Sequence, residues 1–308
     1  MKMQRDFLLL VALAVVAGPA AAQQAVPAAA PTKVAAHGDA AEIPDFSGVW
    51  RHGSLPWFEP PESGPAPVTN LSRRNGVSNY DQLVGDYNNP ILQPWAAEVV
   101  KRYGKISLAG ITFPSPSNQC WPEPVPYIFK HGAMQMLQQN DKITILYNEN
   151  HEIRWIRLNE PHPSPLKPSW HGDSVARYEG DTLVIDTIGV NPNRPYPMID
   201  LFGTPYTKDL HVVERYRLLD YAEAKGALER GDKELMRNGG PLSAGYTGKY
   251  LQIHLTVEDK GAFTTPWTTT ITYAKDTNEW REVDCAENRS EYYNRKESDV
   301  PRADKPDF

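Results

Sequence analysis

The chain has 308 residues, and its 32 basic residues (Lys and Arg) against 38 acidic ones (Asp and Glu) give a formal net charge of −6. A mildly acidic chain without basic blocks argues against nucleic acid or an anionic membrane as a partner. Beyond the N-terminal leader, no run of residues is long and apolar enough to predict a membrane span. The sequence also lacks a glycine-rich phosphate loop and a Gly-x-Ser-x-Gly elbow, so the anchors of nucleotide binding and of α/β-hydrolase catalysis are missing.

The N-terminal segment has the pattern of a secretory signal peptide. Two basic residues precede an apolar stretch at 7–17, and small residues at 20–22 form a cleavage site, so we predict that residues 1–22 are removed on export. Residues 23–42 are rich in Ala and Pro without periodicity and are expected to be a disordered linker. A single domain should then span residues 43–308 and work in the periplasm or outside the cell.

Cys120 and Cys285 are the only cysteines, and an even pair in an exported chain favours a disulfide over a metal site or a nucleophile. Their bond would join the loop-rich part of the domain to its last strand. The eight histidines include no pair at a metal-ligand spacing on a helix and no His-x-His on a strand. We therefore expect no metal site, no metal requirement for folding and no cofactor.

The domain opens with a strand that contains Gly48-x-Trp50, a spacing that resembles the opening strand of lipocalin-type barrels, in which the Trp plugs the closed end. Residues 56–126 are dense in Pro, Asn, Gly and Ser, and only 94–103 has a helical pattern, with Pro near its start and Gly just past its end. A loop-rich excursion of this length is expected to pack over a face of the domain or to form a lid.

After Pro126 the chain becomes a series of short β-rich segments separated by turn residues. Short connections between consecutive strands predict an antiparallel meander, because parallel neighbours need long crossovers. A surface helix with mixed charge is expected at 221–237. The fold class is therefore mainly β, a lipocalin-like barrel of about ten strands with long Pro-rich loops and one inserted helix. After the opening strand, the expected strands are 127–131, 133–139, 142–149, 152–158, 174–179, 182–187, 210–219, 249–259, 264–273 and 280–285.

The segment 170–187 predicts a β-hairpin around a Gly180-Asp181 turn, in which Gly supplies the positive φ of a primed turn. Residues two apart share a face of an extended strand. One face should therefore carry four ionisable side chains, namely His171, Asp173, Arg177 and Glu179. The spacing would let Asp173 orient the His171 imidazole, with Arg177 holding a carboxylate or stabilising an oxyanion. The other interpretation is that Asp173, Arg177, Glu179 and Arg215 form a surface or barrel-end network of ion pairs.

Several motifs, in the same order along most of the mature chain, resemble a widespread family of uncharacterised exported bacterial proteins. Members usually have Trp at the position of Tyr178, and Asp-Gly-Arg where this chain has Leu158-Asn159-Glu160. The resemblance implies the compartment and the order of elements, and it transfers no catalytic residue. The motifs are Asp-Phe-Ser-Gly-Val-Trp50, Pro-Ser-x-Gln-Cys120-Trp-Pro, Arg157 through His162-Pro163, Trp170-x-Gly-x-Ser174, Glu179-Gly-Asp-Thr-Leu-Val-Ile-Asp-Thr187, His211-Val-Val-Glu-Arg-Tyr216, Pro266-Trp267 and Cys285-x-Glu-Asn288.

The leading functional hypothesis is an exported, lipocalin-like binding protein for a small apolar or amphipathic molecule. Trp121 and Trp170, each beside Pro-rich loops, would line the ligand at a barrel mouth. The further expected ligand contacts are Glu179, Glu214 and Arg215. An enzyme is the alternative, a periplasmic hydrolase, isomerase or lyase that uses His171, Asp173 and Arg177. A structural role in the cell envelope is the third possibility, and the sequence carries no signal for the oligomeric state.

Overall fold

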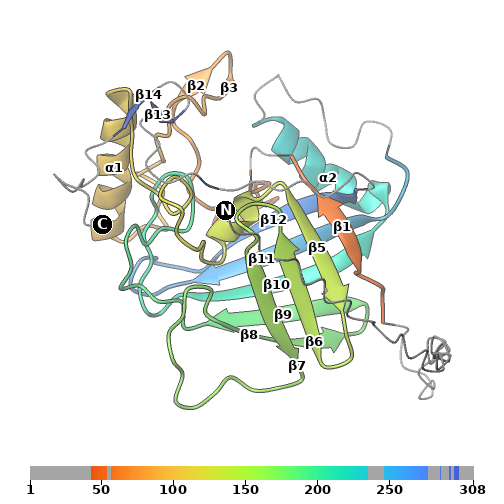
Figure 1. Cartoon of the computed structure of the whole chain (residues 1–308). Coiled ribbons are helices and arrows are strands. Elements are labelled where there is room, and N and C mark those ends of the chain that lie inside the picture. Colours follow the sequence, from red (N-terminus) through yellow and green to blue (C-terminus); the bar gives the residue numbers. More distant parts are fainter. Residues whose placement is uncertain are drawn as a thin grey trace, which may run out of the picture. The chain divides into compact units, whose positions relative to one another are not determined.

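A computed structural model describes residues 43–53, 57–234, 246–276, 285, 291–292 and 295–297. These residues form a mainly β fold in which nine strands close into a barrel (Figure 1). The order of neighbours around the barrel is β1, β12, β11, β10, β9, β8, β7, β6 and β5. The barrel strands are β1 (Gly48–Arg51), β5 (Ala133–Gln138), β6 (Lys142–Tyr147), β7 (Ile153–Leu158), β8 (Asp173–Glu179), β9 (Thr182–Ile188), β10 (His211–Leu219), β11 (Tyr250–Glu258) and β12 (Trp267–Lys275).

The barrel closes through β1, which pairs antiparallel with both β12 and β5. The predicted barrel is therefore confirmed, although the prediction of about ten strands is only approximate. One neighbour pair departs from the expected antiparallel meander, because β7 and β8 are parallel. Parallel neighbours need a long crossover, and the Pro-rich connection 159–172 between these two strands is long enough to supply it.

Both predicted helices are present, with shifted ends. Helix α1 (Pro94–Leu108) has Pro in its first turn and runs beyond the expected 94–103. Helix α2 (Tyr221–Asp232) begins with a capping box between Asp220 and Glu223 and ends before the expected residue 237. Its buried side packs against β10 and β11 through Ala224, Leu228, Leu219 and Tyr250.

One expected strand is wrong. Residues 127–131 do not form a strand, and most of them form the 3-10 helix η1 (Tyr127–Lys130). The first three of these residues are all buried, and an apolar run without alternation does not distinguish a buried strand from a helical turn. The short strands that complete the described elements are β2 (Arg73–Arg74), β3 (Val77–Ser78), β4 (Ile111–Thr112), β13 (Glu291–Tyr292) and β14 (Arg295–Glu297).

Some expectations fall outside the described residues. These are the signal peptide at 1–22, the linker at 23–42, and most of the strand at 280–285. The loop-rich excursion, by contrast, is largely described and joins the barrel through isolated β-bridges. Glu59 pairs with Thr270 of β12, and Leu92 pairs with Phe263 just before β12.

The predicted hairpin is confirmed as β8 and β9. Glu179 and Thr182 face each other across the Gly180-Asp181 turn, and Gly180 has a φ of +62°. The alternation of faces holds within β8, where Ser174 and Ala176 are buried. The outward face of this strand is the one with the ionisable side chains.

Large side chains fill the interior of the barrel. Trp50 is 1% exposed, and its indole Nε1 donates a hydrogen bond to the carbonyl of Phe46 at 2.8 Å. The largest fully buried side chains of the barrel strands in this core are Trp50, Trp267, Tyr147, Tyr216, Tyr273, Met134 and Met136. The barrel is therefore a packed core at these levels, as in barrels of about eight strands whose interior is just wide enough for side chains.

An ion pair lies within this core. Nη2 of Arg154 on β7 is 2.6 Å from Oε1 of Glu214 on β10, and Nη1 is 3.1 Å from Oε2. The hydroxyl of Tyr216 donates to the same carboxylate at 2.7 Å, while Nη2 also reaches the hydroxyls of Ser174 and Thr187 at 3.3 Å. Both charged side chains are at most 1% exposed. The sequence placed Glu214 among the ligand contacts, and the structure places it inside the barrel.

We predict that Glu214→Leu alone destabilises the protein by about 3–5 kcal/mol, because it leaves the guanidinium of Arg154 buried without a counter-charge. The double variant Arg154→Met/Glu214→Leu should recover most of this loss, since neither charge remains. Urea unfolding of the three proteins measures both differences. Glu179→Gln, which removes a surface carboxylate, should leave the unfolding midpoint unchanged. A double variant no more stable than Glu214→Leu would contradict the prediction.

The expected disulfide is also present. Cys120 and Cys285 are bonded, with their Cα atoms 5.5 Å apart and 165 residues between them in sequence. Closing so long a loop restricts the unfolded chain, and the chain-entropy model gives an upper limit of about 5 kcal/mol for the stabilisation.

We therefore expect the native, unreduced protein to resist alkylation and to gain two alkyl groups only after reduction. Intact-mass measurement with and without reductant checks this. The reduced protein should also unfold at a lower temperature. Two thiols that react without reductant would refute the bond.

Candidate functional site

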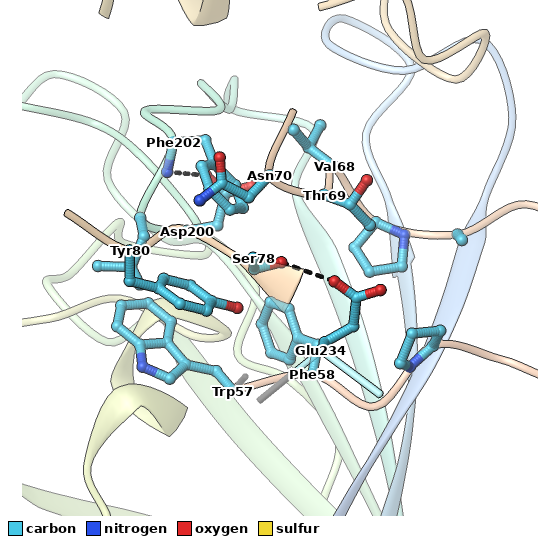
Figure 2. A pocket seen from close by; sticks show the side chains of 14 residues that line it. Trp57, Phe58, Val68, Thr69, Asn70, Ser78, Tyr80, Asp200, Phe202 and Glu234 are labelled. Atoms are coloured by element: carbon cyan, nitrogen blue, oxygen red, sulfur yellow. Dashed lines mark hydrogen bonds between the residues drawn. The ribbon is translucent and has the colours of Figure 1, made fainter. Parts of the chain in front are cut away.

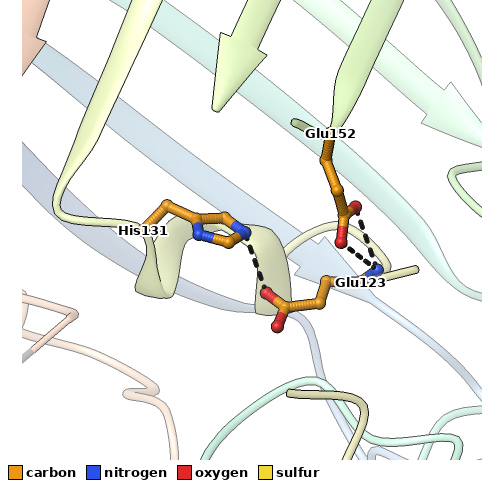
Figure 3. A group of neighbouring side chains, drawn as sticks. All are labelled: Glu123, His131 and Glu152. Atoms are coloured by element: carbon orange, nitrogen blue, oxygen red, sulfur yellow. Dashed lines mark hydrogen bonds and ion pairs between the residues drawn. The ribbon is translucent and has the colours of Figure 1, made fainter. Parts of the chain in front are cut away.

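Three buried ionisable side chains come together from three separate segments (Figure 3). Glu123 belongs to the Pro-rich segment after the disulfide, His131 follows η1, and Glu152 lies just before β7. One donor atom of each lies within 4.8 Å of those of the other two. Their residues are 0%, 1% and 8% exposed, in that order. We call Glu123, His131 and Glu152 the buried cluster.

Each member of the buried cluster is held by a direct contact. Nε2 of His131 lies 3.1 Å from Oε2 of Glu123. The other carboxylate oxygen, Oε1, lies 3.2 Å from Nζ of Lys130 and accepts a hydrogen bond from the Ser117 hydroxyl at 2.9 Å. The carboxylate of Glu152 accepts from the backbone N–H of Glu123 at 3.0 and 3.1 Å. The two carboxylates are therefore neighbours in a space largely closed to water.

The environments of these groups separate their pKa values. Burial raises the pKa of Glu152 to about 8, and the charge of Glu123 adds to the shift. Burial alone would raise the pKa of Glu123 as well, but Lys130 and His131 outweigh it and hold this pKa below its usual range. Burial opposes protonation of His131, yet the Glu123 carboxylate raises its pKa to about 8. Such a split between neighbouring groups is typical of functional sites.

His171 borders the buried cluster. Its Nδ1 lies 2.9 Å from the backbone carbonyl of Glu123, and because a carbonyl only accepts, Nδ1 carries the proton. Its Nε2 lies 3.5 Å from Oε2 of Glu152. Burial lowers the pKa of His171 to about 4, and the charges of Arg154 and Arg194 act in the same direction. A neutral His171 therefore presents the lone pair of Nε2 toward Glu152.

Asp173 does not pair with His171, as the sequence suggested it could. Its carboxylate binds the guanidinium of Arg157 at 2.9 and 3.0 Å and Nδ1 of His162 at 2.6 Å. The reason lies in Gly172, whose φ of +76° turns the chain between His171 and Asp173. The strand begins only at Asp173, so the two-residue periodicity does not reach His171.

The contacts of Asp173 continue along the outside of the barrel. Nε2 of His162 lies 3.0 Å from Asp186, and Nε2 of His211 lies 3.2 Å from the same carboxylate. Arg157, His162, Asp173, Asp186 and His211 form what we call the outer polar cluster. All five side chains are partly exposed, at 17–35%.

Arg177, Glu179 and Arg215 form a separate network on the surface. Both arginines lie 2.5 Å from Glu179, one on each carboxylate oxygen, and their side chains are 55% and 42% exposed. This agrees with the interpretation of these three residues as an ion-pair network. Arg177 therefore does not join His171, and the predicted catalytic set is divided among three places.

Trp121 and Trp170 do come together, as expected for residues that line one site. Their ring centroids are 5.4 Å apart, and the guanidinium carbon of Arg194 lies 4.5 Å from the centroid of Trp170. Arg194 also donates a hydrogen bond to the carbonyl of Trp170 at 3.4 Å. Trp170 is 36% exposed and directly precedes His171 in sequence.

A pocket lies elsewhere, where the excursion meets the loop after β9 (Figure 2), and its cavity volume is about 50 Å³. Its apolar wall consists of Trp57, Phe58, Val68, Tyr80, Leu201 and Phe202. Glu234, at the end of α2, accepts hydrogen bonds from Ser78 at 2.6 Å and from Arg73 at 2.5 Å. We call this the aromatic pocket. The sequence did not indicate it, because its lining comes from irregular loops without a periodic pattern.

Comparison with known proteins assigns neither a family nor a function to the chain. The chain matches no protein-family model, no curated protein sequence and no solved structure. Among the described residues, no helix is long and apolar enough to cross a membrane. The site must therefore be interpreted from its own geometry.

We predict that His171 is the neutral Nδ1–H tautomer at pH 6–7 and takes up a proton only as the pH falls toward about 4. Long-range ¹H–¹⁵N NMR spectra of histidine-labelled protein distinguish the two tautomers and follow the titration. His171→Gln identifies the signals. A midpoint near the usual value of about 6.5, or a proton on Nε2, would contradict the geometry.

Proposed function

We propose that this protein is an exported binding protein for a small amphipathic molecule, which it holds in the aromatic pocket. The observation that carries the proposal is the pocket itself. Aromatic side chains form much of its wall and a few polar groups complete it, which is the lining typical of small-molecule sites, although its cavity volume of about 50 Å³ is small for such a site. The leader pattern and the disulfide support export, because disulfides persist in oxidising compartments.

The packed barrel interior supports a ligand site outside the barrel. A lipocalin-like ligand would need the space that Tyr147, Tyr216 and Tyr273 fill, all of them at most 1% exposed. It would also have to contact the Arg154–Glu214 pair, whose charges already satisfy each other. The protein thus resembles a lipocalin in its barrel but not in the position of the ligand, which we propose lies between the barrel and the excursion.

The lining indicates the chemistry of the ligand. Trp57, Phe58 and Phe202 offer flat apolar contacts. Tyr80 directs its hydroxyl into the space between the lining side chains (Figure 2), and burial raises its pKa, so it stays a neutral hydrogen-bonding group. The carboxylate of Glu234 at the rim disfavours an anion. We infer a neutral or cationic ligand with a flat apolar body and one or two polar groups.

The enzyme alternative gains no support from these contacts. It required Asp173 to orient His171 beside Arg177, and these three side chains have different partners. The residues with separated pKa values are Glu123, Glu152 and His131 instead. We therefore place ligand binding first.

We expect the neutral fluorescent probe N-phenyl-1-naphthylamine to bind the native protein, with rising emission. Ala66 lines the pocket and is partly exposed, so Ala66→Phe should fill the space without creating a cavity. We predict that this substitution weakens probe binding by about tenfold or more, with an unchanged melting temperature.

The matched control is Ala222→Phe, which adds the same side chain at an exposed position of α2. It should leave probe binding as in the native protein. Equal binding by Ala66→Phe and Ala222→Phe would remove the aromatic pocket as the ligand site.

A further inference from the structure

We propose that the buried cluster binds a divalent transition-metal ion of the zinc type, with His171 as an additional ligand on its open side. We expected no metal site from the sequence, because no pair of histidines stands at a metal-ligand spacing along the chain. The structure brings together donors that lie far apart in the chain. This inference is independent of the aromatic pocket and of its ligand.

The donor atoms are aligned for a shared third atom. Nε2 of His131 and Oε2 of Glu123 are 3.1 Å apart, yet both atoms, and Nδ1 of His131, are buried without an aligned hydrogen bond. Ligand atoms around a tetrahedral zinc with bonds of about 2.0–2.2 Å lie roughly 3.3 Å from each other. Figure 3 shows His131 and Glu152 approaching Glu123 from different elements. One donor atom of each lies within 4.8 Å of the others. Small side-chain shifts would close this group around one ion.

His171 has the outer partner that metal-binding histidines use. A ligating imidazole commonly donates its other N–H to a carbonyl or a carboxylate, which fixes the tautomer. Nδ1 of His171 donates to the carbonyl of Glu123 at 2.9 Å. Nδ1 of His131 lies 3.5 Å from Oε2 of Glu149, too far for a well-formed hydrogen bond. Nε2 of His171 faces the carboxylate of Glu152, and Nε2 of His131 faces that of Glu123.

The charges around the site leave one oxygen of Glu123 for the ion. Lys130 and Ser117 hold Oε1, and Lys130 is itself paired with Glu149 at 2.5 Å. Oε2 faces His131. Lys130 and His131 balance the charge of Glu123, and a divalent cation would also balance the neighbouring carboxylate of Glu152, which burial makes costly to ionise.

The donor types select the class of metal. Imidazole nitrogens with carboxylate oxygens suit zinc, and also manganese, iron or cobalt, while calcium and magnesium prefer oxygen alone. The bound ion would join the Pro-rich segment at Glu123, the residue after η1 and the start of β7. His171, whose Nε2 lies 3.5 Å from Oε2 of Glu152, would approach it from the start of the hairpin.

The test uses tag-free protein treated with a chelator and then dialysed against micromolar zinc chloride. Elemental analysis should find about one zinc per chain, with a higher melting temperature than the metal-free protein. Glu152→Gln and His131→Gln keep similar size and remove a ligand, and each should weaken zinc binding by about tenfold or more. His211→Gln, in the outer polar cluster, is the control and should bind zinc as the native protein does.

Cobalt substitution adds a readout that does not depend on stability. Cobalt(II) bound to the native protein should show the visible d–d absorption bands of an ion held by nitrogen and oxygen ligands. It should show no charge-transfer band from a thiolate ligand. If Glu152→Gln does not fold, His171→Gln, at the partly exposed edge, should change these bands.

Absence of retained zinc at micromolar concentrations would overturn the proposal. So would zinc that is lost in His211→Gln but kept in both Glu152→Gln and His131→Gln, because this would place the ion in the outer polar cluster. Binding of calcium or magnesium in preference to zinc would overturn it as well.

Discussion

The buried ion pair between Arg154 and Glu214 is the constraint that links four neighbouring strands of the barrel. Two charges removed from water are tolerated only when they are paired and well hydrogen-bonded. Here the partners come from β7 and β10, and the hydroxyls of Ser174 and Thr187 on the intervening strands add hydrogen bonds to the guanidinium. A one-residue slip of β8 would turn Ser174 to the outside. The pair therefore favours the register of four consecutive strands, including the parallel step from β7 to β8.

The same pair determines where a ligand can bind. Large buried side chains occupy the interior around the pair, whereas the aromatic pocket and the buried cluster both lie where loops cover the barrel. The excursion contributes residues to each of them. Its first part forms the wall of the aromatic pocket, and its last part places Glu123 against His131 and Glu152. Long loops of this kind are where binding residues usually occur, because a rigid scaffold holds them.

The sequence was sufficient for the features that depend on local pattern. Alternation predicted the hairpin β8–β9, and the turn at Gly180 followed from its neighbours. The single pair of cysteines predicted the disulfide. The class of fold followed from the number and spacing of strands. Each of these predictions rests on a pattern within about ten residues, or on the single pair of cysteines.

The remaining features depend on long-range packing or on a backbone conformation that periodicity does not report. Gly172 turned His171 away from Asp173, and the buried run at η1 lacked the alternation that would separate strand from helix. The buried cluster unites residues from segments up to 29 positions apart, from Glu123 to Glu152. Tyr80 and Phe202 meet in the aromatic pocket only through the folded excursion. Neither site has residues at a fixed spacing along the chain, so no sequence pattern indicates it.

The central claim is that the barrel interior is a packed core and that a small ligand binds under the excursion. A crystal of the protein soaked with a brominated naphthylamine tests this most directly, because anomalous scattering locates bromine without assumptions about the ligand. The account predicts one strong bromine peak between Trp57 and Phe202. A peak inside the barrel, among Tyr147, Tyr216 and Tyr273, would contradict it.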